Sequence, residues 1–280
     1  MGEGITQRQQ AVSNTYDIHA AVFSKVGVEV MVKGQDKFRV SVAMATYNGA
    51  SYLREQIDSI LQQLGDQDEL VVSDDGSIDG TCSILQGYQE QDSRIRLLQG
   101  PGNGVKKNVE HAVLNARGRY IFLADQDDIW MPGKVEQVLQ VFEEQNVSVV
   151  VHDARVFAGE DVQKVLMNSF FTFRDSGPGI MKNIIKNSYI GCCMAFRCEL
   201  LKTIVPIPER IEMHDQWIGI LGDYFAGKSF FLPQVLLLYR RHGDNQSAMT
   251  HYGFYRMVRN RLVFLFYFWK RILNLGRKNS

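Results

Sequence analysis

Hydrophobic positions change their spacing repeatedly along the chain from residue 38 onward. A nearly continuous apolar run over residues 38–46 predicts a buried strand, and apolar residues that recur between 53 and 64 at helical spacing predict a helix. Further strands are predicted at 69–73, 94–98, 120–124 and 147–151, and further helices around 84–88, 105–116 and 132–142. Because strands that alternate with helices pair in parallel, we expect an α/β fold with a mostly parallel, doubly wound sheet.

The second half of the chain shows a looser pattern. It predicts a helix at 181–186, a strand at 192–196, a helix that opens at His214, and strands at 230–232 and 235–239 on either side of Pro233. Ser51 and Pro132 stand where two of the earlier helices are expected to begin. We treat residues 38–250 as one domain, with an extension of unassigned role at 1–37 and a separate C-terminal segment at 251–280.

Composition narrows the class of protein. Hydrophobic residues make up 45% of the chain and charged residues 22%, which is typical of a globular protein and excludes a disordered one. The 31 basic residues balance the 31 acidic ones, and this argues against a nucleic-acid partner, which requires a basic surface. The chain shows no signal-peptide pattern, and its longest apolar run covers only residues 262–269, so we expect a cytoplasmic location.

Polar clusters follow three of the predicted strands. They are Thr46-Tyr47-Asn48, Asp74-Asp75-Gly76 and Asp125-Gln126-Asp127-Asp128. In open α/β sheets ligands bind beyond the carboxyl ends of the strands, so these clusters predict a site at that edge. The three carboxylates within residues 125–128 repel one another unless a cation neutralises them, and hard oxygen ligands suit Mg²⁺ or Mn²⁺. The alternative is a solvated helix cap at Asp128.

Other candidate residues have both a chemical and a structural interpretation. Asp75 is placed to accept a hydrogen bond from the imide N–H of uracil or thymine, with Tyr47 as a stacking surface, but it is equally placed to cap a turn. Asp215 opens a helix, so it is either a helix cap or, if the fold brings it near the metal, a general base. His242 follows a strand and is a metal ligand, a phosphate contact or simply an exposed loop residue.

Several nucleotide-binding motifs are missing from the sequence. A Gly-x-Gly-x-x-Gly loop does not follow the first strand, and no Gly-Lys-Ser/Thr loop occurs, so dinucleotide and P-loop chemistry lose their main support. Residues 75–80 resemble the start of a calcium-binding EF-hand loop, but the twelfth position is Gln86 and a strand precedes the loop. We therefore do not expect a calcium site there.

Taken in order, these motifs resemble glycosyltransferase family 2, the inverting enzymes of the GT-A fold, over residues 38–250. The stretch Ala124-Asp125-Gln126-Asp127-Asp128-Ile129-Trp130, with Pro132 and Lys134 after it, is similar to the bacterial rhamnosyltransferase-like branch that builds surface polysaccharides. Two features depart from the family pattern: the 37 leading residues are extra, and Asp244 stands where related sequences often have Asn.

The resemblance implies a role for each candidate residue. Tyr47 and Asp75 hold the nucleotide base, with Thr46 and Asn48 beside them, and Asp125 lies on the ribose side of the metal motif. Asp127 coordinates Mg²⁺ or Mn²⁺ with His242, Asp215 is the general base, and Lys107 or Asn108 contacts the donor. The implied reaction transfers a sugar, with rhamnose from dTDP-rhamnose as the first candidate, to a hydroxyl of a glycan or polyprenyl-linked acceptor.

Two other functional classes remain open at this point. A non-catalytic nucleotide-sugar or membrane-binding protein with the same fold would have lost a metal or base position, yet Asp127 and Asp215 are both present. A sugar-phosphate nucleotidylyltransferase would carry a Gly-rich phosphate loop after the first strand, where this chain has Thr46-Tyr47-Asn48-Gly49-Ala50.

The C-terminal segment predicts a partner of its own. Residues 251–280 contain seven basic residues and no acidic one, together with many aromatic side chains. On a helical wheel six of the basic residues share one arc: Arg256, Arg259, Lys270, Arg271, Arg277 and Lys278. A basic, aromatic helix favours an anionic membrane surface, so we expect peripheral contact at the inner face of the cell membrane. The alternative is a helix that packs on the domain and keeps a solvated basic edge.

Overall fold

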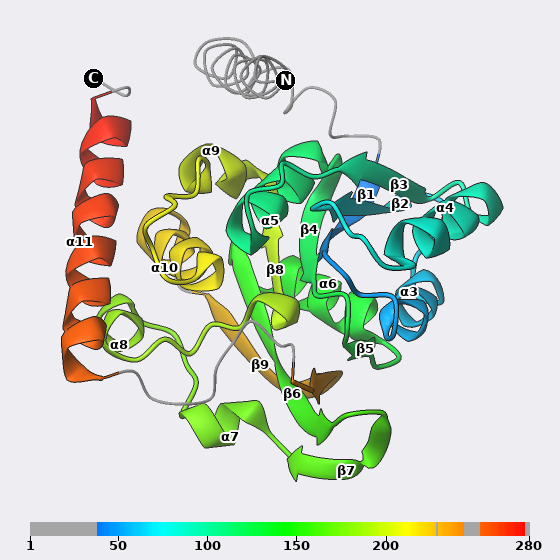
Figure 1. The fold of residues 1–280 in the computed structure, drawn as a ribbon. Coiled ribbons are helices and arrows are strands. Elements are labelled where there is room, and N and C mark those ends of the chain that lie inside the picture. Colours follow the sequence, from blue (N-terminus) through cyan, green and yellow to red (C-terminus); the bar gives the residue numbers. More distant parts are fainter. Residues whose placement is uncertain (1–37, 228, 244–252, 278–280) are drawn as a thin grey trace, which may run out of the picture.

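The central feature of the molecule is a single mixed β-sheet covered by helices (Figure 1). The computed structural model describes residues 38–227, 229–243 and 253–277, so the predictions for the extension at 1–37 lie outside the described residues. Along the sheet the strands follow the order β3-β2-β1-β4-β8-β6-β9-β5, with β7 paired to β6.

The first half of the sheet is parallel, as the alternation of strands and helices predicts. Its strands are β1 (Phe38–Thr46), β2 (Asp68–Asp74), β3 (Ile95–Gln99) and β4 (Gly118–Ala124). The connecting helices are α3 (Leu53–Leu61), α4 (Thr81–Gln91) and α5 (Val105–Asn115). Parallel pairing aligns Thr46 with Asp74 and Met44 with Ala124, so the three strands end at one edge.

The second half of the sheet mixes both directions. Its strands are β5 (Ile129–Trp130), β6 (Val149–Ala158), β7 (Asp161–Met167), β8 (Met194–Arg197) and β9 (Phe230–Arg241). The short β8 runs antiparallel to both β4 and β6, whereas β6 and β9 are parallel. The sheet is therefore less parallel than the sequence predicts, because β8 joins its two halves without a helical crossover of the βαβ type.

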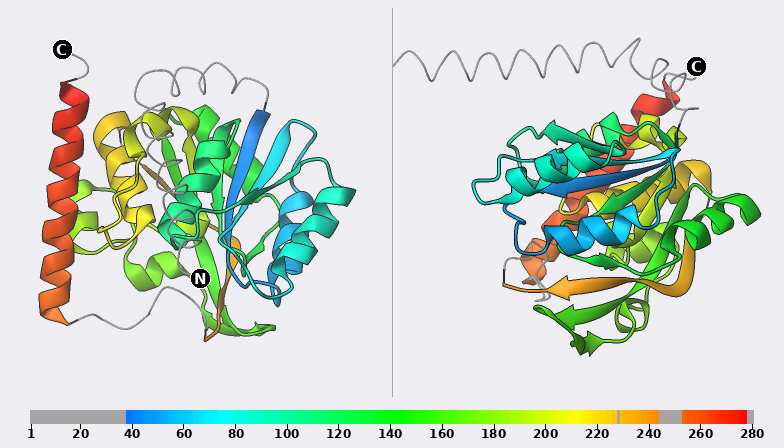
Figure 2. Two further views of the ribbon diagram at one scale, coloured as in Figure 1. Left: turned by 45° about the horizontal axis from the view of Figure 1, so that its top comes forward. Right: turned by 90° about the vertical axis from the view of Figure 1, so that its right-hand side faces the viewer.

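The remaining helices surround this second half. They are α6 (Lys134–Glu144), α7 (Phe170–Arg174), α8 (Ile180–Ile185), α9 (Leu201–Ile204), α10 (His214–Ala226) and α11 (Phe254–Gly276). Two short 3₁₀ turns, η2 (Gly191–Cys193) and η3 (Cys198–Leu200), flank β8. Figure 2 shows α11 standing at the side of the molecule next to α10, far from β3 and α4.

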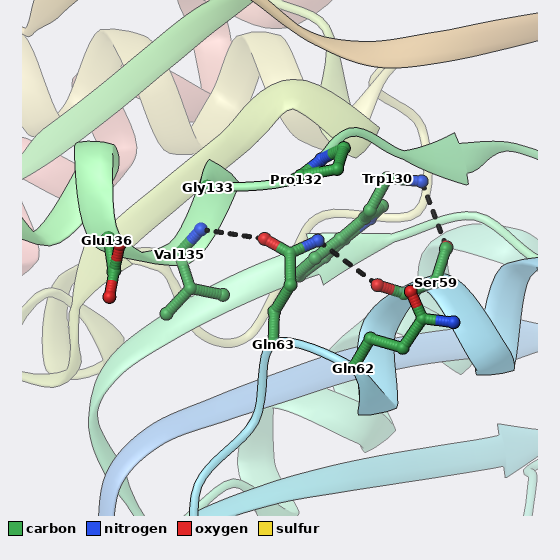
Figure 3. Close-up of a pocket in the computed structure, with 8 residues that line it drawn as sticks. All are labelled: Ser59, Gln62, Gln63, Trp130, Pro132, Gly133, Val135 and Glu136. Atoms are coloured by element: carbon green, nitrogen blue, oxygen red, sulfur yellow. Dashed lines mark hydrogen bonds between the residues drawn. The ribbon is translucent and has the colours of Figure 1, made fainter.

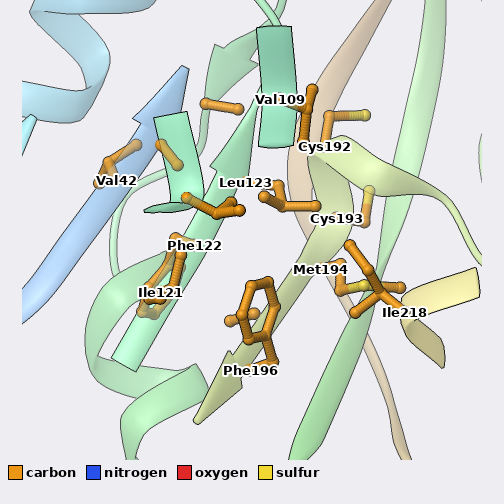
Figure 4. Packing of buried hydrophobic residues seen from close by; sticks show 14 of the residues in the cluster. Val42, Val109, Ile121, Phe122, Leu123, Cys192, Cys193, Met194, Phe196 and Ile218 are labelled. Atoms are coloured by element: carbon orange, nitrogen blue, oxygen red, sulfur yellow. The ribbon is translucent and has the colours of Figure 1, made fainter. Parts of the chain in front are cut away.

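Apolar side chains from the middle strands form the core. Figure 4 shows Phe122 and Leu123 of β4 beside Cys193, Met194 and Phe196. All of these are almost completely buried, and Ile218 of α10 closes the cluster from one side. Fully burying one such side chain contributes roughly 1.5–3 kcal/mol, so this layer fixes the strands whose ends carry the polar clusters.

Several predicted boundaries differ from the structure for identifiable reasons. Pro233 does not divide two strands, because β9 continues through it. The pairing of β9 with β6 is irregular at this point, and the irregularity accommodates the missing N–H of the proline. Ser51 does not cap α3, which begins after Tyr52 without a side-chain cap. Helix α6 begins at Lys134 rather than at Pro132, after Gly133 with φ 82°.

Candidate active site

The three polar clusters that follow β1, β2 and β4 meet at one edge of the sheet. The amide of Gln126 links two of them: its Oε1 accepts from the backbone N–H of Tyr47 at 2.8 Å, and its Nε2 donates to the Tyr47 carbonyl at 3.0 Å. The backbone N–H of Asp75 donates to the carbonyl of Thr46 at 2.9 Å and joins the first two strand ends. The structure thus places these segments side by side, as the sequence predicts.

Thr46 and Asp74 support the site from beneath its surface. Thr46 is 1% exposed, and its hydroxyl donates to Oδ1 of Asp74 at 2.8 Å. Burial acts to raise the pKa of Asp74, but hydrogen bonds from Ser77 and Thr46 outweigh it and hold the pKa below its usual value. Asp74 therefore stays ionised and organises the turn, a role that its sequence position alone does not indicate. Thr46 lies too deep to touch a bound ligand directly.

Asp75 holds the loop that follows β3. Its two carboxylate oxygens accept from the backbone N–H groups of Gly102, at 2.7 Å, and Gly104, at 2.8 Å. This is the turn-organising role considered for the residue from sequence. A carboxylate has about four lone-pair sites, so the bonded oxygens keep acceptor capacity for a ligand. Tyr47 is 54% exposed, so its ring is accessible to a ligand.

The two asparagines predicted at the donor site occupy different places. Asn48 lies at the surface with φ 49°, and its Oδ1 accepts from the backbone N–H of Ile78 at 2.9 Å. Asn108 is 2% exposed, and its Nδ2 donates to the carbonyls of Thr46 and Ser73. The side chain ties β1 to β2 from inside, and its contact with a donor stays a prediction. Lys107 turns toward Glu110.

Asp127 and His242 form a pair of metal-type ligands. Oδ2 of Asp127 lies 2.7 Å from Nε2 of His242, and the two side chains are only 14% and 12% exposed. Arg240 secures this arrangement, since its Nε donates to the Asp127 carbonyl at 2.8 Å while its backbone N–H donates to Asp128. At this distance the two atoms share a hydrogen bond. The carboxylate oxygen of Asp127 is a ligand of the kind that Mg²⁺ and Mn²⁺ prefer, and the imidazole of His242 would be a second ligand, with water and phosphate at the remaining positions.

A second acidic cluster lies directly behind this pair. Asp125, Asp128 and Cys192 bring their ligand atoms within 4.8 Å of one another. Burial and the charge of Asp127 raise the pKa of Asp125 to about 7, and the same causes raise that of Asp128 well above its usual value. Asp128 is completely buried, and Gly133 occupies the N-cap position of α6 without a side-chain cap, so Asp128 is not the solvated helix cap considered from sequence.

Lys134 supplies a cation to these carboxylates. Its side chain is 1% exposed, its Nζ donates to the carbonyl of Cys192 at 2.9 Å, and it lies 3.9 Å from the centre of the Trp130 ring. Burial lowers the pKa of Lys134 to about 8. Neither Lys134 nor Cys192 carries a distinctive sequence signal, because a Lys at a helix start and a Cys in an apolar strand are both common.

Asp215 approaches the same place from another part of the chain. It lies in the first turn of α10, it is 5% exposed, and its Oδ1 accepts from Gln216 N–H at 2.5 Å and Asn187 Nδ2 at 3.3 Å. Burial raises the pKa of Asp215 to about 6. Gly191 lies against the side chains of His214 and Asp215, and the next residue, Cys192, lies beside Asp125. The negative charge of Asp215 accordingly contributes to the raised pKa of Asp125. Burial also lowers the pKa of His214 to about 4, which leaves it neutral at pH 7.

A separate open cavity of about 300 Å³ lies between the end of α3 and the start of α6 (Figure 3). Its wall includes Trp130, whose backbone N–H donates to Ser59 Oγ at 3.0 Å, and Gln63, which bonds to the N–H of Val135. None of the candidate residues lines this cavity. The strand-end cluster is therefore the better candidate for the reaction site.

Comparison with known proteins agrees with this geometry. Residues 41–205 match the family described as glycosyl transferase family 2. TuaG of Bacillus subtilis, named for teichuronic acid biosynthesis, is 31% identical over 217 residues, which are 75% of this chain and 81% of TuaG. A glycosyltransferase of Nostoc sp. is 28% identical over 218 residues, and these matches cover 74% of this chain but only 66% of the Nostoc protein.

Two solved structures share the fold. Staphylococcus aureus TarS, in complex with UDP-GlcNAc, has a TM-score of 0.62 and 20% identity, covering 81% of this chain and 66% of the TarS chain. The mannosyltransferase PcManGT of Pyrobaculum calidifontis, in complex with GDP-Man and Mn²⁺, has a TM-score of 0.57 and 18% identity, covering 84% and 68%. The GT-A fold expected from the motifs is thereby confirmed.

Proposed function

The chain belongs to glycosyl transferase family 2, and on this premise we propose an inverting, metal-dependent transfer of a sugar from a nucleoside diphosphate to an acceptor hydroxyl. The observation that carries this proposal is the meeting of three independent segments. Asp127 follows β4, His242 follows β9, and Asp215 lies in the first turn of α10. His242 pairs with Asp127, and the charges of Asp127 and Asp215 both raise the pKa of Asp125.

We propose that Asp127 and His242 hold a divalent cation. A bound Mg²⁺ or Mn²⁺ would act as a Lewis acid that neutralises the departing nucleoside diphosphate, an effect worth several kcal/mol. The chain's own contribution is to keep this region in place, because Arg240 donates to the backbone carbonyl of Asp127 and to the carboxylate of Asp128. Mn²⁺ in the PcManGT complex, on the same fold, supports the choice of a divalent cation.

Asp215 is our proposed general base. Its carboxylate is buried, accepts hydrogen bonds from Gln216 and Asn187, and lies close enough to Asp125 for their charges to interact. With a pKa of about 6 it is ionised at pH 7 yet basic enough to take a proton from a hydroxyl. The hydroxyl then attacks the anomeric carbon from the side opposite the leaving diphosphate, which inverts its configuration without an enzyme nucleophile.

The donor that we propose carries a pyrimidine base. The exposed ring of Tyr47 offers a stacking surface, and the oxygens of Asp75 retain acceptor capacity for an imide N–H. Uracil and thymine both have this group, so the residues do not separate them. The choice of dTDP-rhamnose over a UDP-sugar rests on the resemblance of residues 124–134 to the rhamnosyltransferase-like branch.

The proposed acceptor is a growing glycan or a polyprenyl-linked sugar in surface polysaccharide synthesis. The name of TuaG, which places that relative in teichuronic acid biosynthesis, supports this class of pathway. The outer face of α11 supports membrane contact, because five of its apolar side chains are more than half exposed along one stripe: Tyr255, Leu262, Phe266, Trp269 and Leu273. No helix in the described part of the chain is long and apolar enough to cross a bilayer.

The proposal divides the chain into the same three parts that the sequence predicts. Residues 38–250 are the transferase domain, residues 251–280 are the membrane-contacting segment, and residues 1–37 are an extension without an assigned role. Of the basic arc predicted from sequence, Arg271 does not face outward, because its guanidinium donates to the carbonyls of Thr203, Val205 and Pro206. Lys278 lies outside the described residues.

Calorimetric titration with the thymidine, uridine, guanosine and adenosine diphosphates in the presence of Mg²⁺ tests the donor proposal. The two pyrimidine nucleotides are expected to bind more tightly than the purine ones, and Asp75→Asn is expected to reduce that preference. Tighter binding of a purine nucleotide by the unaltered protein would refute the assignment of the base.

A further inference from the structure

Helix α11 contacts both of the segments that hold the carboxylate of Asp215. We infer that Asn260 and Arg261, on the inner side of α11, are positioning residues for Asp215. This inference rests on the proposed role of Asp215 as the general base. It assigns to the C-terminal helix a part in the reaction that is separate from membrane contact.

The first contact reaches the segment that leads into α10. Nδ2 of Asn260 donates to Oε2 of Glu212 at 2.7 Å, and Glu212 lies three residues before Asp215. The stretch from Val205 to Met213 pairs with no strand of the sheet, so side-chain contacts decide where it lies. Nζ of Lys106, on α5, donates hydrogen bonds to the carbonyls of Glu209 and Ile211 in the same stretch.

The second contact reaches the segment that follows α8. The guanidinium of Arg261 donates to the carbonyl of Ile185, the last residue of α8, with Nε at 3.1 Å. Two residues later, Asn187 directs its Nδ2 to Oδ1 of Asp215 and its Oδ1 to the backbone N–H of Tyr189. Arg261 thus anchors the start of the segment whose asparagine donates to the proposed base.

The helix that carries these two residues is itself held firmly on the domain. Phe264 and Phe268 are 2% and 4% exposed, and the Phe264 ring lies 5.9 Å from that of Trp217, two residues after Asp215. The guanidinium of Arg271 lies 5.3 Å from the same Trp217 ring. Helix α11 therefore packs against α10, the helix that carries Asp215, and lies beside α8 and α10 (Figure 1).

The expected consequence is a loss of rate rather than of donor binding. A catalytic group displaced by about 1 Å costs roughly a hundredfold in rate, because the reacting atoms leave their near-attack geometry. The donor contacts proposed for Tyr47, Asp75 and Asp125 come from the segments that follow β1, β2 and β4, whereas the hydrogen bonds described for α11 reach residues 185, 203–206 and 212. A positioning role therefore predicts a fall in kcat with an unchanged donor KM.

The test compares the full-length double variant Asn260→Ala/Arg261→Met with Asn274→Ala, a matched change at an exposed position of the same helix. Hydrogen exchange, which needs no substrate, is expected to quicken about tenfold in residues 186–191 and 211–216 of the double variant only. Hydrolysis of dTDP- and UDP-sugars with Mg²⁺, water replacing the acceptor, is expected to slow about tenfold to a hundredfold at unchanged donor KM. Arg261→Lys, which keeps a donor for the Ile185 carbonyl, should recover part of the loss.

Three results overturn the inference. They are wild-type exchange in both segments, wild-type kcat in the double variant, and a change confined to donor KM. Asp215→Asn, measured alongside, separates this inference from the function on which it rests. If Asp215→Asn keeps full hydrolysis, the general-base assignment itself has failed; if it loses hydrolysis while the double variant does not, only the positioning role is wrong.

Discussion

Asp127 is the residue on which the metal assignment depends, since its carboxylate stands 2.7 Å from the imidazole of His242. We expect Asp127→Ala to remove metal-dependent binding of a nucleoside diphosphate and to abolish turnover, while the fold persists because the hydrophobic core does not include this side chain. Calorimetry with and without Mg²⁺ checks this expectation. Asp66→Ala, at an exposed position two residues before β2, is the control. Full activity and unchanged metal-dependent affinity in Asp127→Ala would refute the metal site.

Asp215 gives a prediction in which stability and activity change in opposite directions. Burial raises its pKa from 3.8 to about 6, and this rise corresponds to about 3 kcal/mol. A carboxyl group whose folded pKa is raised favours folding below its unfolded pKa, and this contribution is lost as the pH rises through 4 to 6. We therefore expect Asp215→Asn to be more stable than the unaltered protein at pH 7.5 by up to about 3 kcal/mol, and equal to it near pH 4.

Urea denaturation at the two pH values measures this difference, and donor hydrolysis in the same samples measures the rate. The rate should fall by about 10²–10⁴, the contribution of a positioned base. In the unaltered protein the rate should decline as the pH falls below about 6, because protonation removes the base. A variant that keeps its rate and loses the same stability at both pH values would show that Asp215 is only a helix-stabilising residue.

At the scale of elements, α11 has features of both interpretations of its sequence, a helix that packs on the domain and a helix that contacts a membrane. Its inner face packs on the domain through Phe264 and Phe268, while its outer face is apolar and aromatic. Removing residues 251–280 would therefore expose Trp217 and the surface around it, so deletion does not separate the two roles. Substitutions on the outer face alone do separate them.

We expect the triple variant Leu262→Ser/Phe266→Ser/Trp269→Ser to lose sedimentation with vesicles of phosphatidylglycerol and phosphatidylcholine while keeping its fold. These side chains are 62%, 63% and 56% exposed, so their removal leaves the core intact. Each basic residue near the headgroups adds about 1 kcal/mol, hence high salt should weaken binding by the unaltered protein without abolishing it. Val165→Ser/Leu166→Ser, on the exposed β7, is the control, and wild-type sedimentation of the triple variant would contradict the membrane proposal.

The elements that could be predicted from sequence are those whose pattern reflects local burial. The strand predicted at 38–46 coincides with β1 because both of its faces are buried, which produces an almost continuous apolar run. Strand β9 was wrongly divided at Pro233, because the irregular pairing that accommodates this residue is a property of the neighbouring strand β6. Strand β7 is not predicted because most of its residues are exposed, so its apolar positions do not follow the alternation of a strand with one buried face.

At the scale of the whole molecule, the sequence predicts the site residues that lie at strand ends. It does not predict the residues whose role depends on three-dimensional packing. Parallel strands must end at one edge, so the meeting of Thr46, Asp75 and Asp127 followed from the predicted order. The burial of Asn108 and the position of Lys134 behind the carboxylates required the three-dimensional arrangement, since neither carries a distinctive pattern. The same holds for the contacts of α11 with the segments around Asp215.

The most direct test of the central claim is the anomeric configuration of the sugar released when the purified protein hydrolyses a nucleotide sugar. Proton NMR would follow a panel that begins with dTDP-rhamnose and UDP-sugars, in Mg²⁺ and after chelation. We predict turnover that requires the cation, releases the inverted anomer first, and is lost in both Asp127→Ala and Asp215→Asn. Release of the retained anomer, or turnover that survives chelation and both substitutions, would contradict the proposed mechanism.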